Sequence, residues 1–337
     1  MEKENLIKDI KSKIEEKNYK EAESIIKDIL DKEIYEDKEI YYYYAEILDK
    51  FYDKYLEPID YYKKCLNYNL IELKKVEINY KIGELYILQQ EKLNYENKKQ
   101  EIRNLYNKGK KYFKKSRCKK YNQYFIDSTI YLGECHEMLG EFEKAIKILL
   151  ELKQNYILDD KDEKEVNITL GACYFNLNKF EDAITYLKKI DKKIIDYDTI
   201  SAIKLLSKSY LLVDNPLKSF ETIIYIFKYK KKKPEMITKN DLDTVLSILE
   251  DIIERVFIKD KEIQNEIKNI MYKLAKDDSS ERELIEMYGK LCLKINPDIH
   301  PINKHEVLSI CNKAINMIDN KQSNLYKKLN NKIKELE

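Results

Sequence analysis

The sequence predicts an all-α protein, an α-solenoid of stacked antiparallel helix pairs that ends in a helical extension or cap. The first observation is an internal repeat, because the segments that begin at Tyr131 and Thr169 match each other at an offset of 38 residues. Self-similarity at this period is typical of repeat architectures. The second is composition: six Gly and five Pro in 337 residues leave few helix breaks, and 37% charged beside 43% apolar residues is typical of amphipathic helices.

The two matching segments share small and large apolar residues at equivalent positions. The shared pairs are Leu132 and Leu170, Gly133 and Gly171, Cys135 and Cys173, Phe142 and Phe180, and Ala145 and Ala183. We expect the small residues to let the two helices of a pair approach closely, while the large residues fill the gaps between layers. Gly140 and Asn178 stand between the two helices, where a tight turn is expected.

This order of residues resembles the tetratricopeptide repeat (TPR), whose pattern contains Leu-Gly-x-x-Tyr followed by Ala-x-x-x-Phe. The matching residues are Leu170-Gly171 with Tyr174, then Ala183 with Leu187. The resemblance implies a right-handed solenoid in which the first helix of each pair lines a concave face. The chain departs from the family pattern because its clear repeats lack the early Trp and the closing Pro.

Weaker copies of the repeat flank the two clear ones, at roughly the same spacing. They are marked by Asn18 with Ala22, by Ala45, by Gly83, and by Ser207 with Ser219. We therefore predict a TPR-like array of about six helix pairs over residues 1–227. A basic linker is predicted at 228–240, because the lysine run before Pro234 ends the last clear helix. Residues 241–337 show helical apolar spacing, and we expect them to continue or cap the solenoid.

Composition excludes several classes of protein. The N-terminus has no charged-then-apolar signal pattern, and no apolar run is long enough for a membrane span, so we expect a cytoplasmic protein. A formal net charge of +2 gives no global field that would steer the chain to nucleic acid. The six cysteines form no C-x-x-C pair, and we expect buried free thiols.

We expect no enzyme activity, no metal and no cofactor. The sequence contains no Gly-rich phosphate loop, no nucleophile elbow and no H-E-x-x-H motif. His136 stands where repeats place a core residue, and His300 and His305 lie between Cys292 and Cys311 at a spacing that matches no common zinc pattern.

The remaining candidate is a groove on the concave face that the resemblance implies. Counted from the Gly position of each repeat, the inward-pointing residues are Tyr42, Glu46, Tyr80, Glu84, Ile130, Glu134, Ile168, Phe175, Lys204 and Lys208. We expect an acidic, tyrosine-bearing half and a basic end, which would suit a protein or peptide with basic and apolar side chains. The alternative is that these glutamates are ordinary solvated helix residues.

Two other functions remain open. Lysines interleaved with Tyr112 and Phe113 at 108–120, together with the run at 228–233, could bind nucleic acid or another anionic surface. The small net charge and the scarcity of Arg make this the less favoured hypothesis. A receptor for a signalling peptide, acting through protein contacts, is the other alternative to a passive scaffold or adaptor. The sequence leaves the partner and the oligomeric state open.

Overall fold

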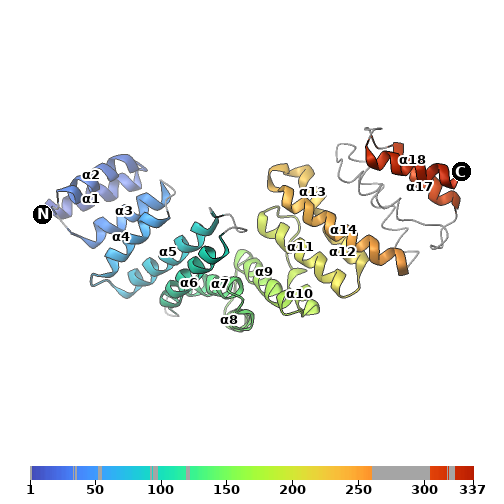
Figure 1. The fold of residues 1–337 in the computed structure, drawn as a ribbon. Helices are drawn as coiled ribbons and strands as arrows, with labels where there is room; N and C mark the ends of the chain where they lie inside the picture. The colour runs from blue at the N-terminus through green and yellow to red at the C-terminus, as the bar shows by residue number, and fades with distance from the viewer. Residues whose placement is uncertain are drawn as a thin grey trace. The chain divides into compact units, whose positions relative to one another are not determined.

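The chain forms two compact units, Met1–Leu177 (unit 1) and Asn178–Glu337 (unit 2). The computed structural model describes residues 2–259, 304–316, 318 and 323–337, with short gaps at 33, 35, 52–54, 92, 94–97 and 119–121. Every regular element in these residues is a helix (Figure 1). The predicted all-α class is therefore confirmed.

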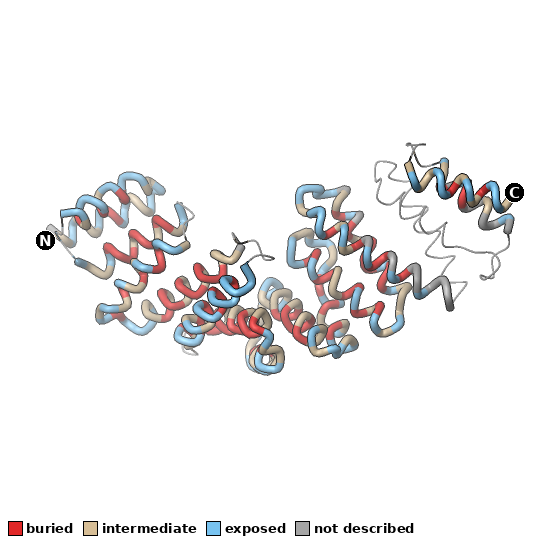
Figure 2. The backbone as a smooth tube through the Cα atoms, in the orientation of Figure 1, coloured by how far each residue is buried: buried red, intermediate tan, exposed pale blue. Residues whose placement is uncertain are grey.

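Unit 1 is built from consecutive helix pairs. Its helices are α1 (Glu2–Glu15), α2 (Tyr19–Asp31), α3 (Lys38–Lys50), α4 (Leu56–Leu66), α5 (Glu72–Glu91), α6 (Lys99–Ser116), α7 (Asn122–Met138), α8 (Phe142–Asn155) and α9 (Asp160–Asn176). Helices α1 to α8 pack as four successive pairs, and α1 contacts α3, α5 contacts α7 and α7 contacts α9. At these three places the first helices of neighbouring pairs therefore stack on one another, as in a TPR-like solenoid. Buried residues follow the helix faces that meet inside the unit (Figure 2).

Small residues set the distance between paired helices, as the sequence predicts. A Cβ atom added at Gly133 on α7 would lie 2.8 Å from side-chain carbons of Leu149 on α8. A Cβ added at Gly83 on α5 would lie 2.8 Å from the ring of Phe113 on α6. Since real Cβ atoms do not approach carbon so closely, only glycine allows these two contacts.

The turn after the first helix of a pair is left-handed in several repeats. Gly140 has a φ of +79°, and the non-glycine residues Lys17, Asn178 and Asp214 have φ values of 61°, 58° and 57°. After Lys17, Gly140 and Asp214 the next amide donates to a carbonyl five residues back, which closes the end of the first helix. The tight turn predicted at Gly140 and Asn178 is thus present.

Unit 2 contains α10 (Phe180–Leu187), α11 (Tyr197–Leu212), α12 (Pro216–Ile223), α13 (Tyr225–Lys232), α14 (Lys239–Lys259), α17 (Lys304–Asn316) and α18 (Asn324–Leu336). Ser207 on α11 and Ser219 on α12, both fully buried, hold the two helices together. Each hydroxyl donates to the other residue's carbonyl, at 2.9 and 2.8 Å. The two small serines therefore allow α11 and α12 to approach closely, as glycine does in other helix pairs.

The predicted basic linker at 228–240 is largely helical. It holds the end of α13, a 3₁₀ turn η1 (Pro234–Met236) and the start of α14. Tyr229 is 3% exposed and belongs to one core with Phe220 and Val245. Apolar residues among the lysines therefore fix this segment. The predicted domain boundary after residue 227 stays a prediction, and residues 260–303 of the predicted extension lie outside the described residues.

Candidate binding face

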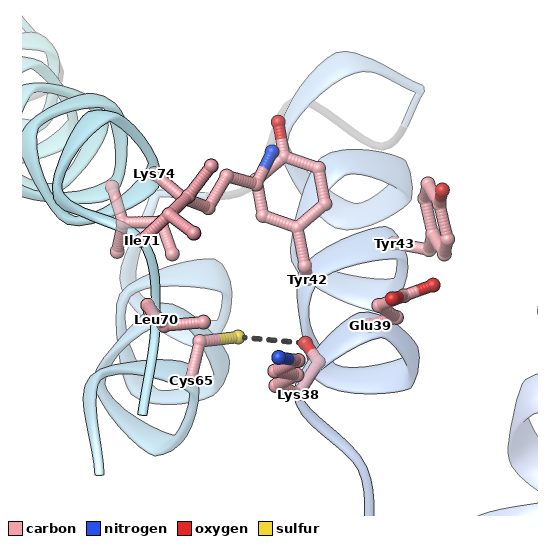
Figure 3. Close-up of a pocket in the computed structure, with 9 residues that line it drawn as sticks. Lys38, Glu39, Tyr42, Tyr43, Cys65, Leu70, Ile71 and Lys74 are labelled. Atoms are coloured by element: carbon pink, nitrogen blue, oxygen red, sulfur yellow. Dashed lines mark hydrogen bonds between the residues drawn. The ribbon is translucent and has the colours of Figure 1, made fainter. Parts of the chain in front are cut away.

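Tyr42 on α3 is the first predicted groove residue, and it lines a pocket of about 370 Å³ between α3 and the start of α5 (Figure 3). Its side chain is largely buried, and its hydroxyl donates to Oε1 of Glu77. The ammonium of Lys74 lies 3.3 Å from the centre of the Tyr42 ring and 3.1 Å from Oε2 of Glu77. Tyr42 is therefore a wall residue whose polar end is already bound within the chain.

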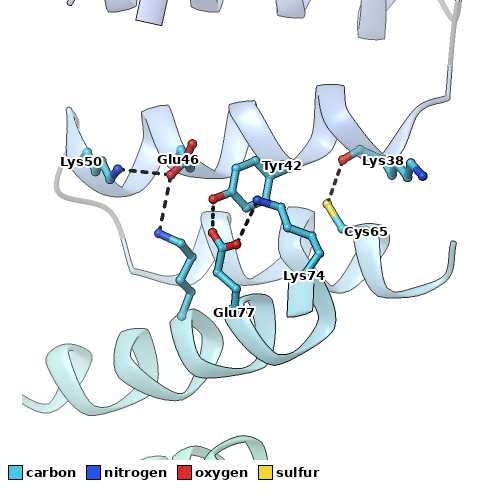
Figure 4. A network of polar contacts seen from close by, with 8 residues as sticks. Lys38, Tyr42, Glu46, Lys50, Cys65, Lys74 and Glu77 are labelled. Carbon is cyan, nitrogen blue, oxygen red and sulfur yellow. Dashed lines mark hydrogen bonds and ion pairs between the residues drawn. The ribbon is translucent and has the colours of Figure 1, made fainter. Parts of the chain in front are cut away.

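Glu46, one turn further along α3, does not offer a free negative charge. Its carboxylate forms ion pairs with Lys50 at 3.2 Å and with Lys81 of α5 at 3.6 Å (Figure 4). Its side chain is only 14% exposed. Two lysines thus compensate the charge that the sequence suggests for an acidic groove at this point.

The next predicted pair, Tyr80 and Glu84 on α5, lies among aromatic rings. The Tyr80 ring centre is 5.7 Å from that of Tyr124 and 6.0 Å from that of Tyr131, both on α7. The Tyr131 ring in turn stacks at 5.0 Å on Phe113 of α6. The Tyr80 hydroxyl donates to the Glu84 carboxylate at 3.4 Å. Helices α5, α6 and α7 therefore build one aromatic cluster with a carboxylate beside it.

A second carboxylate, Asp127 of α7, belongs to the same cluster. Burial, and then the nearby charge of Asp162 on α9, raises the pKa of Asp127 to about 6. Burial also raises the pKa of Glu84, although Lys81 opposes the shift. Neither carboxylate forms an ion pair with a lysine or arginine of the described residues. We call Tyr80, Glu84, Tyr124, Asp127 and Tyr131 the tyrosine–carboxylate face.

The predicted groove residues on α7 and α9 divide into two kinds. Ile130 is 1% exposed and packs in the interior, so it cannot line a surface. Glu134, Ile168 and Phe175 are half-buried. The face on α7 is therefore formed by Tyr124, Asp127 and Tyr131 rather than by Ile130.

The predicted basic end of the groove lies in unit 2 and is partly neutralised. The ammonium of Lys204 on α11 forms an ion pair with Asp241 of α14. Burial opposes the charge of Asp241, but hydrogen bonds from Lys204 and Thr238 outweigh it and lower the pKa of this carboxyl. Lys208 is exposed.

Several lysines of the two basic patches lie on aromatic rings or pair with carboxylates of the chain. Within 108–120, Lys108 lies 5.5 Å from the centre of the Tyr86 ring and Lys115 lies 5.2 Å from that of Tyr112. Lys110 forms an ion pair with Glu141 at 3.1 Å. In unit 2, Lys228 stacks on Tyr225 at 4.5 Å. Such contacts leave the ammonium groups near water but hold their stems on the protein.

Reactive groups in the described part of the chain have structural roles. His136 is 6% exposed and its Nδ1 pairs with Glu141. Burial raises the pKa of the Cys65 thiol to about 12, which keeps it protonated. Among the described residues no group of three or more His, Cys, Asp or Glu could hold a metal ion, and none of their helices could cross a membrane.

The sequence did not predict Tyr124, Asp127 and Tyr131 as residues of the face, although one signal could have located the aspartate. The position six residues before the Gly position of the repeat is acidic in four successive repeats: Glu39, Glu77, Asp127 and Glu165. We call these residues the acidic ladder. This position lies three residues before one inward position and seven residues before the other, so at 3.6 residues per turn its side chain points within about 60° of both.

The stacked helix pairs, joined by left-handed turns, define a TPR-like repeat protein. No protein-family model matches the chain, and no curated protein matches its sequence. Among solved structures, the apo form of the quorum sensor NprR from B. thuringiensis is 13% identical, with a TM-score of 0.47 over 98% of this chain and 86% of that one.

Two further solved structures are similar to this chain. The apo form of RapI is 15% identical, with a TM-score of 0.44 over 88% of this chain and 99% of that one. Yeast Tom70 is also 15% identical, with a TM-score of 0.41 over 95% of this chain and 58% of that one. The assignment of the fold rests on the helix pairs of the chain itself.

Proposed function

We propose that the chain is a non-catalytic scaffold or adaptor that binds a protein or peptide segment with basic and apolar side chains on the tyrosine–carboxylate face. The observation that carries the proposal is the pair of half-buried carboxylates, Glu84 and Asp127, beside three tyrosine rings. The charges of Lys81 and Lys161 act on them, but neither carboxylate forms an ion pair with a lysine or arginine of the described residues. An ammonium or guanidinium group from a partner would supply the missing charge through charge-assisted hydrogen bonds and contacts with the rings.

The acidic ladder brings a carboxylate to α3, α5, α7 and α9 in turn, although Lys74 already pairs with Glu77 at 3.1 Å and Lys161 with Glu165 at 3.6 Å. A binding surface that runs over several repeats suits an extended or helical segment better than a compact ligand. The same face would serve a receptor for a short signalling peptide that acts through protein contacts.

We further propose a cytoplasmic location. Cys65, Cys118, Cys135, Cys173 and Cys311 are free thiols, which is the state that a reducing compartment maintains.

The proposal is tested with two fluorescein-labelled peptides and the full chain. One peptide alternates lysine and leucine, and the other alternates glutamate and leucine. Fluorescence anisotropy should show binding of the lysine peptide only. Asp127→Asn and Glu84→Gln should each weaken that binding about tenfold, because a hydrogen bond to a charged group contributes roughly 1.5–3 kcal/mol.

Glu143→Gln is the matched control, because Glu143 is exposed on α8 and lies outside the face. The substitution removes one negative charge, as the two face variants do. It should leave the affinity unchanged. Equal binding of both peptides, or equal losses in the control and the two face variants, would overturn the proposal. A labelled single-stranded oligonucleotide in the same assay measures the competing hypothesis at the basic patches.

A further inference from the structure

We infer that the pocket between α3 and the start of α5 is an anchor site for one bulky apolar side chain of the partner. The inference rests on the proposed function, because it adds an apolar contact to the basic one on the tyrosine–carboxylate face. Both features share helix α5, which carries Ile78 at the pocket and Glu84 at the face. One bound segment could therefore reach both.

The lining of the pocket is partly polar, since Lys38, Glu39 and Tyr43 belong to it. The polar ends of Tyr42, Cys65 and Lys74 are engaged within the chain. The Cys65 thiol donates to the carbonyl of Lys38 at 3.2 Å (Figure 3). The Tyr42 hydroxyl and the Lys74 ammonium are both bound to Glu77 (Figure 4). Because their hydrogen-bond donors are bound within the chain, these three side chains contribute mainly carbon atoms to the pocket surface. An apolar group that contacts these three side chains would leave water without breaking any of their hydrogen bonds.

Aliphatic side chains form the rest of the lining. Leu70 and Ile78 form part of the wall, and both are buried. Ile71 lines the same pocket and is 74% exposed. An apolar side chain entering the pocket would cover Ile71 and remove its surface from water. The volume of about 370 Å³ falls within the range of specific ligand pockets, roughly 300–1,000 Å³.

The spacing along α5 fixes where the apolar residue should stand relative to the basic one. Ile78 and Glu84 are six residues apart, which is a rise of roughly 9 Å along the helix axis and a rotation of about 120° around it, so their Cα atoms are roughly 10 Å apart. An extended segment covers this distance in about three residues at roughly 3.3 Å each. The partner should therefore carry a leucine, isoleucine, phenylalanine or methionine about three positions from a lysine or arginine.

The test uses labelled Gly/Ser peptides that contain two adjacent lysines and differ only in one further residue. Leucine is placed three residues before the lysines, three residues after them, eight residues away on either side, or is replaced by glycine. One of the two peptides with leucine at three residues should bind at least fivefold tighter than the glycine peptide. The peptides with leucine at eight residues should bind like the glycine peptide.

Ile71→Gln in the full chain locates the effect, because Ile71 is exposed and its loss should not disturb the core. This variant should lose most of the gain from leucine and keep its affinity for the glycine peptide. Ile157→Gln is the matched control, since Ile157 is 98% exposed and lies outside the pocket. Ile157→Gln should retain the gain in affinity that leucine gives.

The outcomes separate the two proposals. If the glycine peptide and every leucine peptide fail to bind, the proposed function is wrong and the anchor site with it. If the glycine peptide binds and leucine adds nothing at three residues, only the anchor site is wrong. The same conclusion follows if the gain survives in Ile71→Gln, or if Ile157→Gln removes it equally.

Discussion

At the scale of single residues, Asp127 is a carboxyl group whose charged form is disfavoured in the folded chain. Its pKa rises from 3.8 to about 6, mainly because the carboxyl is half-buried on α7. Between these two pH values the folded chain binds more protons than the unfolded chain does. Its contribution to stability therefore falls as the pH rises from about 4 through 6, which is the sign expected for a carboxyl with a raised pKa.

Asp127→Asn should consequently stabilise the free protein at pH 8, where the wild-type carboxyl is charged. At pH 4 the two proteins should melt at nearly the same temperature, because the protonated acid resembles the amide. Thermal unfolding followed by circular dichroism at both pH values measures the difference. The same variant should bind the lysine–leucine peptide more weakly. A variant that melts lower than wild type at pH 8 would show that the charge has a structural partner after all.

At the scale of the helix pair, the turn is the element that carries strain. Lys17 adopts a φ of 61°, whereas glycine stands at the equivalent position in the turn between α7 and α8. The left-handed region is costly for a residue with a Cβ atom and free of that cost for glycine. The amide of Asn18 donates to the carbonyl of Lys13 at 2.7 Å, so the turn cannot relax without breaking this bond.

Lys17→Gly should therefore raise the free energy of unfolding by about 0.5–1 kcal/mol. The control is Lys11→Gly, an exposed position inside α1, which should lower it by about 1 kcal/mol. Urea unfolding at pH 7 gives both values. If the two substitutions change stability in the same direction, the turn at Lys17 is not strained.

Helix pairs are also the scale at which sequence reasoning succeeds. Periodic Gly and small residues predict the contacts of Gly133 and the left-handed turn at Gly140, because these are local consequences of backbone geometry. The candidate site was predicted only in part. Glu46 is neutralised by Lys81, and Lys204 by Asp241, and both partners come from another helix. The periodicity of residues along one helix carries no information about ion pairs between helices. The sequence alone therefore could not distinguish Asp127, which forms no ion pair, from Glu46, which does.

At the scale of the whole chain, every residue of the tyrosine–carboxylate face and the anchor pocket lies in unit 1. Repeat arrays draw their stability from neighbouring repeats, so a fragment that keeps whole neighbours can keep its local structure. Residues 1–177 contain α1 to α9 together with the cores that they form.

We therefore expect the fragment 1–177 to be helical, to melt cooperatively and to bind the lysine–leucine peptide with the affinity of the full chain. The fragment 178–337 should not bind it. Circular dichroism establishes folding, and anisotropy measures binding for each fragment. Binding by 178–337, or weak binding by a folded 1–177, would contradict the assignment of the site to unit 1.

The half-buried carboxyl of Asp127 has one more consequence, which concerns protons rather than affinity. Near pH 6 the free chain carries a fraction of a proton on this group. A cationic side chain that arrives beside it favours the charged form and expels that proton into the solution. Titration calorimetry at pH 6 in two buffers of different ionisation enthalpy should then give different heats for the same partner. At pH 8 the heats should agree, so proton release marks a partner that occupies this face.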